Sequence, residues 1–88
     1  MPTISVFFGI VVQMYYRDHP PPHVHAIYQG FEALVEIETG AIIGGRLPGP
    51  AALMMRDWVV AHRSELTANW ARCRMLQPLE KVPGADLE

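Results

Sequence analysis

The chain has 88 residues, of which half are apolar and 18% are charged, and its formal net charge at neutral pH is −2. This length fits one domain with a single modest core, and the apolar content excludes an intrinsically disordered chain. The small net charge and an isoelectric point near 6.0 argue against a strongly basic nucleic-acid-binding protein. The single cysteine, Cys73, excludes an internal disulfide and a metal site made of cysteines alone.

No segment of the sequence has the features of a signal peptide or of a membrane span. A basic stretch followed by an apolar one is missing near the N-terminus, and no apolar run reaches the roughly 18 residues that a membrane helix needs. We therefore expect a cytoplasmic protein.

Residues 3–16 alternate between apolar and other side chains with a period of two, which predicts a long strand with one buried face. The side chains expected to point inward are Ile4, Val6, Phe8, Ile10, Val12, Met14 and Tyr16. Gly9 lies in the middle of this run, where it lowers strand propensity. It predicts a bulge or bend that divides the strand into a short edge piece and a main piece.

Two further strands are expected over residues 23–28 and 31–38, because both segments alternate and Gln29-Gly30 stands between them at the spacing of a two-residue hairpin. In that register His23 lies opposite Glu36, and His25 lies opposite Leu34. A second turn at Thr39-Gly40 then leads into a shorter fourth strand from Ala41, which Gly44-Gly45 weakens.

The rest of the chain has helical periodicity, which begins after Pro48-Gly49-Pro50 and ends at Pro78. The predicted apolar stripe consists of Leu53, Met54, Trp58 and Ala61, and then of Leu66, Trp70, Cys73 and Leu76. His62-Arg63-Ser64 is either a corner between two helices, with Ser64 as the N-cap, or part of one long helix.

These elements predict an α+β fold, an antiparallel meander of three to four strands with one face covered by a C-terminal helical segment of one or two helices. We expect a single domain over residues 1–82 and a frayed tail over 83–88. The other face of the sheet is more apolar than a solvated face should be, which predicts self-association or a small partner protein there. Its side chains include Val11, His25, Ile27, Leu34 and Ile43.

The segment 18–25 contains three of the four histidines and three of the eight prolines. The prolines fix an extended connection that returns the chain to the start of the second strand. The hairpin register gathers His23, His25 and Glu36 on one side, and His19 and Asp18 can complete the set from the strand end. Two imidazoles and a carboxylate are ligands of zinc and of other divalent metals, and such binding weakens as the pH falls through the histidine range.

A purely structural interpretation of the same residues stays open. His23 and Glu36 would then form an exposed pair that contributes about 0.2 to 1 kcal/mol, and Asp18 would accept main-chain hydrogen bonds at a strand end. His62 is predicted to be a cap or an edge of the core, and Cys73 to be buried and inert. The arginines of the helical region are scattered among acidic residues, which favours a solvated face over a DNA-binding one.

Many short segments of the chain together resemble the small bacterial family called domain of unknown function 4160. They are Met1–Ser5, Gly9–Val12, Met14–Tyr16, Asp18-His19, Pro21–Ala26, Tyr28, Glu32-Ala33, Gly45–Pro48, Trp58, His62-Arg63, Glu65-Leu66 and Asn69-Trp70. The resemblance implies no activity, but it implies one half of a two-gene, toxin–antitoxin-like pair. Gly49-Pro50-Ala51 departs from the basic residues that similar proteins often have there, which weakens a nucleic-acid role.

The sequence favours a protein-interaction module with a histidine-rich metal site over an enzyme. The first alternative is a metal-dependent hydrolase or nuclease, in which His23, His25 and Glu36 bind the metal and His19 or Asp18 acts as the base. The second alternative is a transcriptional regulator, which the acidic isoelectric point and the lack of a basic recognition helix disfavour.

Overall fold

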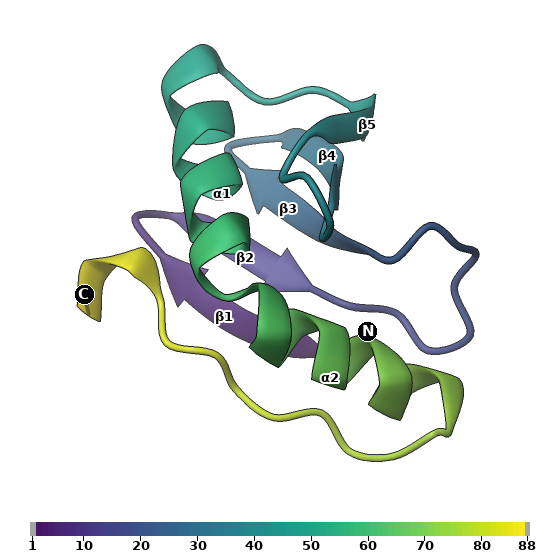
Figure 1. Cartoon of the computed structure of the whole chain (residues 1–88). Helices are drawn as coiled ribbons and strands as arrows, with labels where there is room; N and C mark the ends of the chain where they lie inside the picture. The colour runs from purple at the N-terminus through teal and green to yellow at the C-terminus, as the bar shows by residue number, and fades with distance from the viewer. Residues whose placement is uncertain (1, 88) are drawn as a thin grey trace.

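A five-stranded antiparallel sheet carries two helices on one of its faces in the computed structural model, which describes residues 2–87 (Figure 1). The strands follow one another across the sheet in chain order, since every connection is a hairpin or a short loop. Their bounds are β1 Thr3–Phe7, β2 Ile10–Gln13, β3 His23–Tyr28, β4 Phe31–Glu36 and β5 Ile42–Gly45. The helices are α1 Gly49–Ala61 and α2 Arg63–Arg74, and a short 3-10 helix spans Ala85–Leu87. The α+β class is confirmed, but the sheet has five strands where three to four were predicted.

The additional strand comes from the N-terminal segment, which is a hairpin instead of one divided strand. Phe8 and Gly9 form a two-residue turn, with φ of 50° and 78°, so that Phe7 pairs with Ile10. Two positive φ values are what a type I′ turn requires, and its twist matches that of the paired strands. The turn changes which side chains point inward: Phe7 is 1% exposed, whereas Val6 is 59% exposed.

The hairpin of β3 and β4 has the predicted register. Gln29 and Gly30 both have positive φ, and His23 lies opposite Glu36. The inward side chains of both strands are buried in one core, against Met14 and the helices. The opposite face of β3 carries His23 and His25.

The helical region consists of two helices that meet at His62, so the corner was the right alternative. The cap of α2 is His62 and not Ser64: its main-chain N–H donates to Trp58 and its carbonyl accepts from Leu66. Leu53 and Leu76, predicted in the apolar stripe, are more than half exposed. The helical side chains that are buried are Ala51, Met55, Trp58, Val59, Leu66, Asn69, Trp70 and Cys73. No helix in the described part of the chain is both long and apolar enough to cross a membrane.

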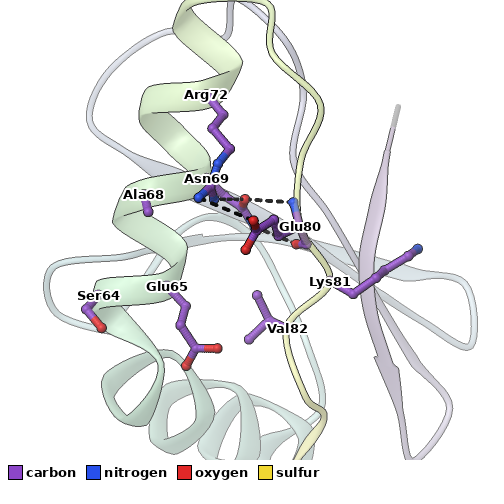
Figure 2. A pocket seen from close by; sticks show the side chains of 8 residues that line it. All are labelled: Ser64, Glu65, Ala68, Asn69, Arg72, Glu80, Lys81 and Val82. Carbon is purple, nitrogen blue, oxygen red and sulfur yellow. Dashed lines mark hydrogen bonds and ion pairs between the residues drawn. The ribbon is translucent and has the colours of Figure 1, made fainter.

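The segment after α2 runs back along the sheet and is held by a buried amide (Figures 1 and 2). Asn69, which is fully buried, accepts a hydrogen bond from the main-chain N–H of Glu80 (3.0 Å) and donates one to its carbonyl (2.8 Å). Further along, the N–H of Val82 donates to Ile4, and the indole of Trp58 donates to the carbonyl of Pro83 (2.9 Å). The boundary between the domain and the tail at residue 82 stays a prediction, and residues 1 and 88 lie outside the described residues.

A cavity of about 270 Å³ lies between α2 and this segment (Figure 2). Most of its polar side chains are already engaged: Arg72 donates to Asn69, Glu65 contacts His62, and Lys81 donates to the carbonyl of Thr3. The cavity therefore marks where the C-terminal segment is attached to α2. Its lining consists of Ser64, Glu65, Ala68, Asn69, Arg72, Glu80, Lys81 and Val82.

We predict that Trp70→Ala lowers the free energy of unfolding by about 3 to 5 kcal/mol, because the indole is 7% exposed and its loss leaves a cavity. Such a loss is a large part of the roughly 5 to 15 kcal/mol that stabilises a typical domain. Urea unfolding measures it, with Leu76→Ala as the control, since that side chain is 54% exposed and should change stability by about 0.5 kcal/mol or less. Equal effects of the two substitutions would contradict the assignment of Trp70 to the core.

Candidate metal site

Strand β3 and the loop before it bring three potential ligands together. Alternation along β3 places His23 and His25 on the same face, and both are buried, at 5% and 8% exposed. The loop of residues 14–22 between β2 and β3, which we call the β2–β3 loop, returns Asp18 to these histidines. Three consecutive prolines, residues 20–22, end this loop and fix φ at three successive positions. The chain bends at Pro20 and Pro21, where an extended connection was predicted, and then enters β3.

One oxygen of Asp18 contacts both imidazoles. Its Oδ2 lies 2.9 Å from Nε2 of His23 and 3.0 Å from Nε2 of His25. The three potential ligand atoms all lie within 4.8 Å of one another. The other oxygen, Oδ1, accepts the main-chain N–H of His19 (2.8 Å). Asp18 therefore offers a single oxygen to the histidines, and we call Asp18, His23 and His25 the His–Asp cluster.

The remaining ring nitrogens also face oxygen atoms. Nδ1 of His23 lies 2.8 Å from the carbonyl oxygen of Pro21, which can only accept, so this nitrogen carries the hydrogen. Nδ1 of His25 lies 3.3 Å from a carboxylate oxygen of Glu32, which is a longer contact to a half-exposed side chain. Both contacts favour the tautomer in which Nδ1 is protonated and Nε2 has a lone pair.

Two neutral histidines have fewer N–H groups than the ring nitrogens of this cluster have oxygen neighbours. Two neutral imidazoles carry one N–H each, yet all four ring nitrogens face an oxygen acceptor. With Nδ1 of both rings protonated, the lone pairs of two Nε2 atoms and of Asp18 Oδ2 point at one another. In that tautomer, additional protons or a cation between His23, His25 and Asp18 would satisfy these lone pairs.

The surroundings of the cluster are partly apolar. The ring of Tyr15 stacks on His25, with the centroids 3.8 Å apart and the planes at 11°, and Trp70 lies 5.4 Å from His23. Cys73 is 1% exposed, as predicted; burial, and then the charge of Asp18, raise the pKa of its thiol. Charges inside such walls interact more strongly than they would in water.

The electrostatic balance keeps Asp18 ionised. Burial raises the pKa of Asp18, but hydrogen bonds with His25, with the His19 amide and with His23 outweigh it, so the pKa lies below its usual value. The pKa of the Tyr15 phenol is raised, because burial and the negative charges of Glu32 and Asp18 disfavour its ionised form. At neutral pH the cluster thus contains one carboxylate and a neutral phenol beside it.

The five residues predicted as ligands do not all meet. Among the described residues, Asp18, His23 and His25 form a group close enough to hold one ion. Glu36 lies opposite His23 as predicted, but its carboxylate accepts the hydroxyl of Thr39 (2.8 Å). His19 is exposed and contributes its main-chain N–H to Asp18. As metal ligands, all five stay predictions.

Two neighbours of the cluster were not predicted to take part in it, Tyr15 and the carbonyl of Pro21. Tyr15 follows β2 by two residues, and Gln13 in β2 pairs with His25, which is why the phenol reaches that imidazole. The register of β2 and β3 would have revealed this contact. The nine-residue loop between them has no turn signature from which the register could be predicted.

Residues 9–71 match the family described as Domain of unknown function (DUF4160). No curated protein and no solved structure matches the chain. The matched range covers well over half of the 88 residues and includes the whole His–Asp cluster. The chain therefore belongs to the family Domain of unknown function (DUF4160).

Proposed function

We propose that this domain binds one divalent transition metal ion, zinc, through Nε2 of His23, Nε2 of His25 and Oδ2 of Asp18. The observation that carries the proposal is the convergence of these three atoms, with each nitrogen about 3 Å from the same oxygen. The alternative is that both rings are protonated. It requires two buried cations whose ring centroids are 5.2 Å apart. Asp18 contacts both rings, but the second neighbouring carboxylate, that of Glu32, contacts His25 alone and is half-exposed, so the two carboxylates offset the repulsion only in part.

The donor set favours zinc. Two imidazole nitrogens and one carboxylate oxygen are ligands that zinc prefers, whereas magnesium and calcium require mostly oxygen ligands. The amide of His19 donates to Oδ1 of Asp18, and Oδ2 is the oxygen that faces both histidines, which favours binding through Oδ2 alone. A ligand that contributes one atom supports the low coordination number of a tetrahedral zinc site, with the fourth position left to water or to another ligand.

The contacts behind the ligands support the same proposal. A histidine that binds a metal usually donates its other ring N–H to a carbonyl or a carboxylate, which fixes its tautomer and orientation. Pro21 supplies such a carbonyl to His23, and Glu32 supplies such a carboxylate to His25. Both histidines are thus held with Nε2 toward Asp18.

A structural or regulatory metal fits the cluster better than a hydrolytic one. Five cavities of the described residues, including the one between α2 and the C-terminal segment, have no lining residue from the His–Asp cluster. A hydrolase needs room for a substrate beside its metal-bound water. We therefore favour a metal-stabilised interaction module over an enzyme, and the toxin–antitoxin-like pairing stays a prediction from the family resemblance.

Self-association through the uncovered sheet face is a second proposal. Val6, Val11 and Ile27 lie in one row across β1, β2 and β3, and Leu34 lies in the next row. The helices cover the opposite face (Figure 1), and Val6 is 59% exposed. An apolar row of this kind on one side of a sheet favours a second copy of the chain as its cover.

The metal proposal predicts one zinc ion per chain by calorimetry at neutral pH, with protein purified without a histidine tag. His23→Ala and His25→Ala should each lower the affinity by more than the roughly 10- to 100-fold that the loss of an outer-shell contact costs. Glu36→Gln is the matched control, because Glu36 lies on the same face opposite His23 but outside the cluster. No zinc binding by the wild type, or equal affinity in the wild type and both histidine variants, would refute the proposal.

The second proposal predicts a dimer in sedimentation experiments and a monomer for Leu34→Lys, because a lysine places a charge within the apolar face. Leu53→Lys serves as the control, since Leu53 is an exposed leucine on α1, away from this face. A wild-type protein that stays monomeric at high micromolar concentration would rule out self-association.

A further inference from the structure

The middle of the β2–β3 loop is attached to the rest of the molecule mainly through the His–Asp cluster. Asp18 contacts both histidines, Tyr15 stacks on His25, and the carbonyl of Pro21 accepts from His23. Three residues of the loop therefore depend on two side chains of one strand. Whatever strengthens the attachment of Asp18 to these two imidazoles therefore also holds the middle of the loop.

The two ends of the loop are attached independently of the cluster. At its start the N–H of Met14 donates to Pro2, and the side chain of Met14 is fully buried. At its end the carbonyl of Pro22 accepts the N–H of Ile37. Between these points, one further hydrogen bond, from the Tyr16 hydroxyl to the carbonyl of Gln77 (3.1 Å), reaches the segment after α2. The ends can thus stay in place while the middle opens.

The middle of the loop has little burial of its own to keep it closed. Tyr16, Arg17, His19, Pro20 and Pro21 are all exposed. Arg17 also has a φ of 59°, in the left-handed region that side chains other than glycine rarely adopt. A segment that is exposed and strained in this way belongs to the low-stability part of a domain unless a specific contact holds it.

We infer that the metal ion regulates this loop: it ties Asp18 to the two histidines of β3 and so keeps residues 15–21 closed. The inference rests on the proposed function and adds a role to it. The two histidines stay on β3 whether the loop is open or closed, but Asp18 is a ligand only when the loop is closed. The ion therefore binds the closed form more tightly, and it must shift the population toward that form by the same factor.

Cleavage by chymotrypsin tests the inference within one chain. Tyr16, 39% exposed, is a cleavage site inside the loop, and Phe8, 58% exposed, is a site in the β1–β2 turn, at the opposite end of β2 from this loop. If zinc binds the closed form alone, free zinc at about ten times its Kd lowers the open population roughly tenfold. Cleavage after Tyr16 should then slow by about that factor, with the cleavage after Phe8 unchanged.

Two variants distinguish the link between Asp18 and the β3 histidines from other effects of zinc. Asp18→Ala removes the ligand that the loop contributes and leaves both histidines, so zinc should no longer slow cleavage after Tyr16. Tyr16→Phe removes the hydroxyl that contacts Gln77 but keeps an aromatic chymotrypsin site and the whole cluster. In this variant the metal-free loop should be cut faster, but zinc should slow its cleavage by about the same factor as in the wild type, because that factor depends on the free zinc concentration and on the Kd of the closed form.

The outcomes distinguish this inference from the proposed function. If calorimetry shows that zinc binds and cleavage after Tyr16 does not change, the loop is not tied by the metal, although the metal site stands. Equal slowing after Tyr16 and Phe8 would also overturn the inference, because it would mean that zinc stabilises the whole domain. If zinc does not bind at all, both the proposed function and the inference fail.

Discussion

Side chains along β3 alternate between the two faces of the sheet, and both the fold and the candidate site depend on this alternation. Val24 and Ala26 point inward and are fully buried at the centre of the five-stranded sheet, so the strand cannot rotate or shift by one residue without exposing them. The same alternation turns His23 and His25 to the opposite face. The packing of the core thereby fixes the distance between the two imidazoles before any contact with Asp18 is made.

Much of the sheet could be predicted because local turn chemistry determined it. Gln29-Gly30 favours a two-residue turn, and this turn alone gives the register that places His23 opposite Glu36. The N-terminal hairpin was missed for the converse reason: apolar residues continue at every second position through the turn, and Phe8 is an unusual residue at a positive φ. Apolar alternation alone cannot distinguish a hairpin turn from a bent strand when the alternation continues through the turn.

The carboxylate of the cluster illustrates the same limit at the level of side chains. The hairpin register places Glu36 opposite His23, but a carboxylate oxygen of Glu36 accepts the hydroxyl of Thr39. Asp18 instead contacts both imidazoles from the β2–β3 loop. Competition from a nearby hydroxyl and the path of a nine-residue loop depend on tertiary contacts. Sequence spacing therefore placed the two histidines on one face and named Asp18 among the candidates, but the contact of Asp18 with both rings depends on the path of the loop.

The proline run at the end of the β2–β3 loop has a consequence for how easily that loop moves. Pro20, Pro21 and Pro22 have no main-chain N–H, so opening the loop breaks no hydrogen bond donated by their backbone. Residues whose φ is fixed by a ring also gain little conformational entropy when they are released. The free energy of opening is therefore set almost entirely by side-chain chemistry, by a few imidazole, carboxylate and phenol groups, which makes this segment responsive to what binds them.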